Sequence, residues 1–269
     1  MIGNRFKQLP ENPALSIFFT AGYPRLNDTM PIITALQVSG VDMVEVGFPF
    51  SDPVADGPTI QESNLVALAN GMTIKLLFEQ LSKLRSGSIT MPVLLMGYLN
   101  PVERYGCERL FEEAARCGID ALILPDMPFD EYLARYRPLF KRNSIQPVFL
   151  ITTRTEDERI RELDAEDPAF LYVVSSDAIT GGRAEVSQER ERFFKHLMEM
   201  GLKSRLIVGF GVSDRESFNL VTKHTDGAII GSAFLRTIAK IDLKTTGSTS
   251  PKQDISGYVA DFIKQIRHG

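Results

Sequence analysis

Residues that commonly bind metal ions are scarce in this sequence, which contains only two cysteines and three histidines. Cys107 and Cys117 do not fall at a metal-binding spacing, and we interpret both as reduced, inert thiols of a cytoplasmic protein. The histidines, at positions 196, 224 and 268, lie away from the ends of the predicted strands. The sequence therefore predicts no metal site, and a chain of this length needs no disulfide to stabilise its core.

Long apolar runs and an excess of positive charge are also missing. No run approaches the ~20 residues of a membrane span, and the first segment, MIGNRFKQLPENP, lacks the apolar centre of a secretory signal. The net charge of −4 provides no long-range attraction for nucleic acid or for an anionic membrane. We therefore expect a cytoplasmic protein that binds neither.

What the sequence does contain is a series of short apolar runs separated by helical patterns. The runs are near-continuously apolar, which is typical of parallel strands buried on both faces. Eight such strand and helix repeats predict a single-domain (β/α)8 TIM barrel, with a doubly wound open sheet as the alternative. The predicted strands are Leu15–Phe19, Met43–Gly47, Val93–Met96, Ala121–Leu124, Pro147–Ile151, Phe170–Val174, Arg205–Gly209 and Gly227–Gly231.

No internal domain boundary is visible, so residues 1–269 are predicted to form one barrel domain. The only linker-like stretch is TTGSTSP, at residues 245–251. Apolar residues recur at helical spacing after it, and they predict a last helix that packs back on the barrel.

The stretch EVGFPFSDPVADGPTIQ, from Glu45 to Gln61, carries several acids and no basic residue. Glu45 lies near the end of a predicted strand, where barrels place their active sites. A carboxylate in an apolar strand is costly unless it is paired or functional, and burial would raise its pKa toward neutral pH. Asp52 and Asp56 follow on a proline-rich loop that we expect to extend to about Gln61. For Asp52, a solvent-exposed loop acid without a function is an equally good interpretation.

Glycines follow the sixth, seventh and eighth predicted strands. They include Gly181, Gly211 and Gly231, and the last precedes Ser232 and a short predicted helix, 233–238. Backbone N–H groups beside glycine approach an anion closely, and barrels often bind phosphate after their last two strands. Tight turns without a ligand are the alternative.

Several chemistries are excluded by what the strand ends lack. No lysine is placed there for a Schiff base, no cluster of histidine or cysteine for zinc, and no G-x-G-x-x-G motif follows the first strand. What remains is proton chemistry by carboxylates on a small phosphorylated substrate.

The same stretch, Glu45–Gln61, resembles the signature of the tryptophan synthase alpha subunit family. FFTAGYP at 18–24, LPDMPFDE at 124–131, GFGVS at 209–213 and IIGSAF at 229–234 are similar to the other motifs of that family. The resemblance implies a barrel lyase that cleaves indole-3-glycerol phosphate to indole and glyceraldehyde 3-phosphate. It also implies an αββα complex in which indole passes to the beta subunit for tryptophan synthesis. No cofactor is implied in this subunit, and pyridoxal phosphate is expected only in the beta partner.

The resemblance also implies roles for individual residues. Glu45 would donate the proton to the indole ring, and Asp56 would bind the indole N–H. The indole pocket would contain Phe18, Leu95, Tyr172 and Phe210, with Thr180 on the loop that closes over the substrate. Gly181, Gly211, Gly231 and Ser232 would bind phosphate, and Pro49, Asp52 and Asp126 would face the beta subunit.

The sixth loop departs from the family pattern. It reads Ser176-Asp177-Ala178-Ile179-Thr180-Gly181 where the family usually has Arg-Ala-Gly-Val-Thr-Gly, and Tyr23 replaces a usual aspartate. These changes leave two alternatives open. One is a catalytically weakened alpha subunit that acts mainly as an allosteric activator of the beta subunit, and the other is a different phosphosugar-handling barrel enzyme.

Overall fold

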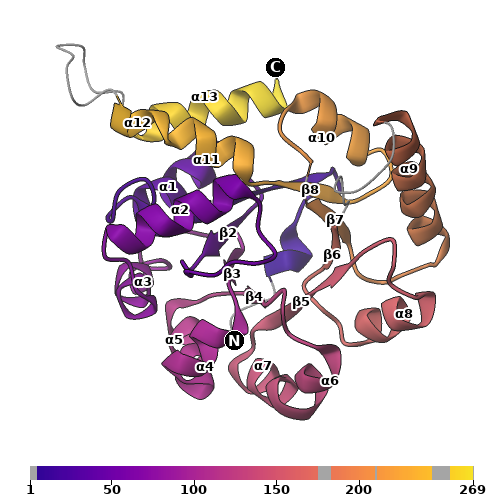
Figure 1. Cartoon of the computed structure of the whole chain (residues 1–269), viewed down its shortest axis with the longest axis horizontal. Coiled ribbons are helices and arrows are strands. Elements are labelled where there is room, and N and C mark those ends of the chain that lie inside the picture. Colours follow the sequence, from indigo (N-terminus) through magenta and orange to yellow (C-terminus); the bar gives the residue numbers. More distant parts are fainter. Residues whose placement is uncertain (1–4, 175–182, 210, 244–254, 269) are drawn as a thin grey trace.

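A computed structural model of the chain describes residues 5–174, 183–209, 211–243 and 255–268. Within these residues eight parallel strands close into a barrel, in which each strand pairs with the next and β8 pairs with β1 (Figure 1). The fold is therefore a (β/α)8 barrel, as predicted, and the open sheet is excluded. The strands are β1 (Ala14–Thr20), β2 (Met43–Gly47), β3 (Val93–Met96), β4 (Ala121–Ile123), β5 (Gln146–Ile151), β6 (Leu171–Val174), β7 (Leu206–Gly209) and β8 (Gly227–Ile230).

The helices lie around the outside of the barrel and cover the strands (Figure 1). Helix α5 buries Leu110, Phe111 and Ala114, which is the apolar face that its sequence spacing predicts. A left-handed Gly118 ends it, since glycine adopts this conformation without steric cost. The helices are η1 (Arg5–Gln8), α1 (Thr29–Val38), α2 (Pro58–Ala69), α3 (Ile74–Leu81), α4 (Leu99–Tyr105), α5 (Cys107–Cys117), α6 (Phe129–Glu131), the π-helical η2 (Tyr132–Tyr136), α7 (Arg137–Asn143), α8 (Asp157–Ala165), α9 (Arg183–Glu199), α10 (Arg215–Val221), α11 (Ser232–Ile238), α12 (Lys240–Leu243) and α13 (Ile255–Arg267).

The last helix, α13, returns to the barrel as its apolar spacing predicts. It packs against α1, α10 and α11, and together these helices form one side of the molecule (Figure 1). Its buried face contains Val259, Phe262, Ile263 and Ile266. The linker-like stretch that precedes it, 245–251, lies outside the described residues.

The loop after β2 is shorter than predicted. Helix α2 begins at Pro58, so the loop ends at Gly57 rather than near Gln61. Proline suits the first helical position because its missing N–H would have no partner there. The loop that follows Glu45 therefore occupies only residues 48–57.

An ion-pair network holds the opposite, N-terminal end of the barrel together. The carboxylate of Asp120 accepts hydrogen bonds from Arg5 at 2.6 Å, from Arg85 at 2.5 Å and from the amide of Val93 at 2.8 Å. Arg85 also donates to the carbonyl oxygen of Gly118. Because Asp120 is only 7% exposed, it is the buried anion on which both guanidinium groups depend.

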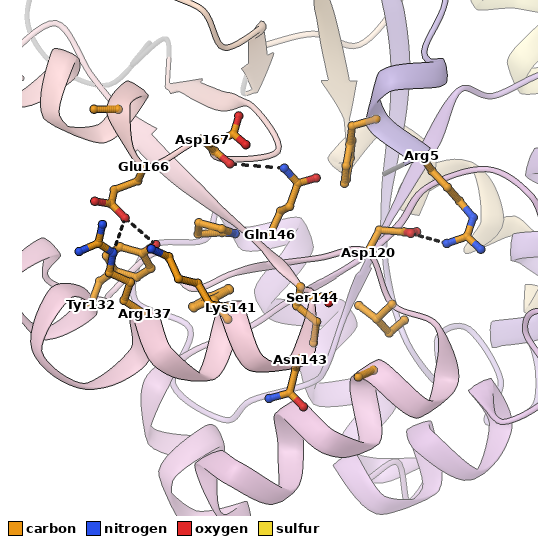
Figure 2. A pocket seen from close by; sticks show the side chains of 17 residues that line it. Arg5, Asp120, Tyr132, Arg137, Lys141, Asn143, Ser144, Gln146, Glu166 and Asp167 are labelled. Carbon is orange, nitrogen blue, oxygen red and sulfur yellow. Dashed lines mark hydrogen bonds and ion pairs between the residues drawn. The ribbon is translucent and has the colours of Figure 1, made fainter. Parts of the chain in front are cut away.

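A cavity of about 540 Å³ opens beside this network (Figure 2). It is lined by η1, by the start of β5 and by segments that precede β4, β5 and β6, so it lies at the end of the barrel that usually contributes stability rather than catalysis. Arg5 and Arg137 face it, but Arg5 is paired with Asp120, and Arg137 with Glu166 at 2.8 Å. Since protein carboxylates already neutralise both cations, we interpret this cavity as part of the structural network.

Candidate active site

Glu45 is the only carboxyl side chain on the strands that the structure describes. It lies on β2, in register with Phe18 on β1 and Leu94 on β3, and it is 0% exposed. Tyr172 on β6 is the only other titratable side chain on those strands. The barrel therefore isolates one acid among apolar neighbours.

Burial changes the chemistry of Glu45. Loss of solvation raises its pKa from 4.5 to about 8, and a hydrogen bond from Ser16 opposes part of this rise. The Ser16 hydroxyl donates to Oε1 at 3.0 Å, whereas Oε2 has no hydrogen-bond partner within the described residues. Glu45 can therefore hold a proton at neutral pH and present it on Oε2.

Asp56 lies on the loop between β2 and α2 and is only partly buried. Its Oδ2 accepts a hydrogen bond from the hydroxyl of Tyr98 at 2.9 Å, and that hydroxyl accepts one from the amide of Ala55 at 3.1 Å. Burial raises the pKa of Asp56 and the bond from Tyr98 lowers it. The two acids thus occupy different environments, since Glu45 is fully buried on a strand and Asp56 is partly exposed on a loop. Different environments can separate a proton donor from an ionised partner.

Sequence reasoning missed Tyr98. Its position directly after the third strand could have pointed to it, because active-site residues of barrels follow the strand ends. Its ring also contacts Phe50 with centroids 5.5 Å apart, which fixes the side chain between two loops.

A cavity of about 130 Å³ lies at the C-terminal ends of the strands beside these acids. It brings together six of the predicted site residues from β1, β6 and the loops after β2, β7 and β8. These are Phe18, Asp56, Tyr172, Gly211, Gly231 and Ser232, and the lining also includes Gly57, Ile60, Met96, Val212 and Ile229. Glu45 does not line this cavity, but its register partner Phe18 does. The charges of Glu45 and Asp56 both raise the pKa of Tyr172, which lines the cavity as well.

Leu95 is buried but does not line this cavity, whereas Met96 does. Successive strand residues point to opposite faces, and Leu95 pairs with Val46 rather than with Glu45. Met96 lies on the face that Glu45 shares with Leu94. The prediction of Leu95 was therefore wrong by one residue along β3: Met96 lines the cavity, and Leu95 faces the other side of the strand.

Two glycines shape this end of the barrel. A Cβ atom at Gly209 would lie 2.0 Å from the hydroxyl oxygen of Tyr172, so the phenol occupies space that any other residue would fill. Gly211 has φ +75°, a conformation that favours glycine. Both positions therefore favour glycine for structural reasons, whether or not phosphate binds there.

The remaining predicted site residues lie outside the described residues or away from this cavity. Thr180, Gly181, Phe210 and the altered positions 176–178 lie outside the described residues. Pro49 is buried and lines a groove of about 390 Å³ together with Leu68, Ile74, Pro101 and Tyr105. Asp52 is exposed, and Asp126 accepts the amide of Leu99 at the start of α4.

Within the part of the chain that the structure describes, no group of three or more histidine, cysteine or acidic residues is arranged to hold a metal ion. In the same residues, no helix has the length and apolar character needed to cross a membrane.

Comparison with known proteins identifies a family over nearly the whole chain. The sequence model of the tryptophan synthase alpha chain family matches residues 6–265. The chain is 49% identical over 226 residues to the tryptophan synthase alpha chain of Flavobacterium psychrophilum, covering 84% of this chain and 89% of that protein. It is 46% identical to the alpha chain of Flavobacterium johnsoniae over 253 residues, 94% of each chain.

A solved structure is similar throughout. The tryptophan synthase subunit alpha of Legionella pneumophila str. Paris superposes with a TM-score of 0.82 at 28% identity, covering 98% of this chain and 97% of that chain. Fold and sequence therefore lead to the same family.

Proposed function

This chain belongs to the tryptophan synthase alpha chain family, and from the geometry of its site we propose how its residues carry out the reaction of that family. The chain is a carbon–carbon lyase of tryptophan biosynthesis. It cleaves indole-3-glycerol phosphate to indole and glyceraldehyde 3-phosphate, and the indole passes to the beta subunit. The observation that carries the proposal is a lone buried acid beside an ionisable, hydrogen-bonded second acid.

Glu45 supplies the proton that starts the cleavage. Protonation of C3 of the indole ring produces an electron-poor ring that accepts the electron pair of the C3–C1′ bond as that bond breaks. The C1′ hydroxyl then loses its proton to the Glu45 carboxylate, and its oxygen becomes the carbonyl of the aldehyde. Indole leaves, and Glu45 is protonated again. A pKa of about 8 suits this dual role because the group must both give and take a proton near neutral pH.

Asp56 stabilises the positive charge that develops on the indole nitrogen. Only its ionised form carries the negative charge that stabilises the indole nitrogen, and the bond from Tyr98 favours that form. Because the aspartate is already oriented before substrate binds, little reorganisation is needed when the charge appears.

The walls of the cavity hold the rest of the substrate. Phe18 and Tyr172 line it with aromatic rings suited to the indole, and we propose Met96 for the place expected of Leu95. Gly211, Gly231 and Ser232 follow β7 and β8, where their amides would bind the phosphate. Thr180, Gly181 and Phe210 remain proposed substrate residues on the resemblance of their motifs.

The partner is the beta subunit, and we propose that the two assemble as an αββα complex. The groove of about 390 Å³ that Pro49 lines adjoins the loops after β2 and β3, close to the candidate active site. Asp52 on the loop after β2 and Asp126 on the loop after β4, both exposed, would contact the partner. This subunit works without a cofactor, and pyridoxal phosphate belongs to the beta subunit.

Residues 1–269 are proposed to form one domain, with 245–251 as a linker before the last helix. We propose a cytoplasmic location because both cysteines, Cys107 and Cys117, are unpaired. No observation favours the alternative of a catalytically weakened subunit that acts mainly as an allosteric activator. Glu45 and Asp56 are both present, and each accepts a hydrogen bond from a hydroxyl group.

Indole release from indole-3-glycerol phosphate, measured with and without the beta subunit across a range of pH, tests the proposal. Glu45 must be protonated, so kcat/KM should fall as pH rises through about 8. Asp56 must be ionised, so kcat/KM should also fall as pH drops through a pKa that lies above its usual 3.8. A chain that activates the beta subunit but releases no indole alone or in complex would contradict the catalytic proposal.

Replacing Tyr98 with phenylalanine should move only the acid side of this profile. The ring stays against Phe50, but Asp56 loses a hydrogen bond that lowers its pKa. The acid limb should therefore shift to higher pH, and kcat/KM should fall about tenfold, in line with a hydrogen bond to a charged group.

The matched control is Tyr132→Phe, which removes a tyrosine hydroxyl from Glu166, 3.3 Å away at the opposite end of the barrel. It should leave the profile in place. Identical profiles for Tyr98→Phe and the wild type would show that this hydrogen bond does not orient Asp56.

A further inference from the structure

Ser16 points its hydroxyl at the carboxyl group of Glu45 inside the barrel. It precedes Phe18 by two residues on β1, so the two side chains share a face of the strand. Ser16 and Glu45 are both 0% exposed, and Oγ lies 3.0 Å from Oε1. A buried hydroxyl in an apolar strand is costly without a partner, and here the partner is the only acid on the described strands.

The hydrogen bond distinguishes the two oxygens of Glu45. Oε1 accepts from Ser16, whereas Oε2 is buried without a partner in the described part of the chain. A protonated carboxyl with Oε1 as its carbonyl oxygen must carry the proton on Oε2. The serine thus determines which oxygen holds the proton and how the carboxyl plane is turned.

We propose that Ser16 is a positioning residue for the cleavage reaction, whose hydroxyl orients Glu45 for proton transfer from Oε2 and stabilises the carboxylate that remains. The inference rests on the proposed role of Glu45, and it assigns a second residue to the same reaction. When Glu45 is protonated, the Ser16 hydroxyl donates a hydrogen bond to its carbonyl oxygen, Oε1. After proton transfer it meets a negative charge, and hydrogen bonds to charged acceptors are stronger. The bond therefore strengthens as the proton leaves.

Few other groups can influence the titration of Glu45. Its neighbours in register, Phe18 on β1 and Leu94 on β3, carry no charge. Among the residues that the structure describes, Tyr172 from β6 and Asp56 from the loop after β2 are the titratable groups that interact in this space. Neither is altered by a change at Ser16, so a shift in the titration of Glu45 can be assigned to the lost hydroxyl.

The test is Ser16→Ala, with Glu45 titrated directly by infrared difference spectroscopy of the protonated carboxyl, using Glu45→Gln as the reference. Because the serine lowers the pKa of Glu45, its removal should raise that pKa by about one unit, which corresponds to a hydrogen bond to a charged group. The value of kcat should fall about tenfold, and KM should change little because the hydroxyl does not line the cavity.

Two further variants separate positioning from packing. Ser16→Thr keeps the hydroxyl and should restore both the pKa and kcat. Thr20→Val removes another buried hydroxyl on the same face of β1, one that bonds Ser63 at 2.6 Å, and should leave the titration of Glu45 unchanged. If the added methyl group of threonine prevents folding, the titration of Ser16→Ala still decides the matter.

An unchanged Glu45 titration in Ser16→Ala would overturn the proposal, even if kcat fell, because the loss would then come from packing. Wild-type protein that releases no indole would instead refute the proposed function, and the infrared titration would still report on the Ser16–Glu45 bond. The two failures therefore give different results.

Discussion

Replacing Glu45 with glutamine should reduce the kcat for indole release about 10²–10⁴-fold, the usual contribution of a positioned general acid. Glutamine has almost the same shape, and its carbonyl oxygen can accept the Ser16 hydroxyl in place of Oε1. What it lacks is a proton that can be transferred to the indole ring. Steady-state assays of indole release provide the measurement.

The same substitution should leave the fold intact and change the pH dependence of stability in a known direction. Between pH 4.5 and about 8 the unfolded chain loses the proton of Glu45 while the folded chain keeps it. The unfolded state then binds fewer protons, so the free energy of unfolding decreases as pH rises through this window. Glu45→Gln removes that contribution, and urea unfolding at several pH values should show a smaller decrease than the wild type.

Glu62→Gln, which changes an exposed acid on α2, is the matched control and should keep wild-type activity. Wild-type cleavage by Glu45→Gln would mean that another group donates the proton. Loss of activity together with a loss of folded structure would assign the effect to the core instead of to chemistry.

Replacing Asp120 with asparagine should lower the free energy of unfolding by about 3–5 kcal/mol, the usual cost of removing one partner from a buried ion pair. Its carboxylate neutralises both Arg5 and Arg85, whose side chains are only 19% exposed. Without it, two mostly buried guanidinium groups remain beside each other with no counter-charge. Chemical unfolding of the variant and the wild type measures the difference.

Glu79→Gln is the control for this prediction. Glu79 pairs with Lys75 at 3.8 Å on an exposed face of α3, where the loss should stay within about 0.5 kcal/mol. Because Asp120 lies at the end of the barrel opposite the candidate site, the folded fraction of Asp120→Asn should retain its kcat. Equal stability of the two variants would show that the Asp120 network is not a source of stability.

The strands can be located from the sequence because burial on both faces makes them near-continuously apolar. The bounds of β2 and β3 agree with their predicted ranges, β1 is longer by one residue at each end, and the other strands differ by one residue at one end. A strand buried on both faces is apolar at most positions, so its limits lie close to the limits of the apolar run. The end of the loop at Gly57 was harder to locate, since Pro58 suits a rigid loop and a first helical position equally.

Glu45 was predictable for the same reason, because a carboxylate inside an apolar run stands out in the sequence. Its burial raises its pKa. Leu95 shows the limit of this reasoning. Leu95 and Met96 are both apolar and adjacent, and only the pairing of β3 with β2 places Met96 on the side of the cavity.

The local pattern of the chain thus determined the barrel, the end of the barrel that carries the site, and the acid at its centre. Only the tertiary structure decided which hydroxyl groups meet the two acids. Ser16 is 29 residues from Glu45 and Tyr98 is 42 residues from Asp56, and neither pair has a signature in the sequence. A hydrogen bond depends on distances of about 3 Å and on direction, and for residues so far apart those are set by how the strands close around the barrel.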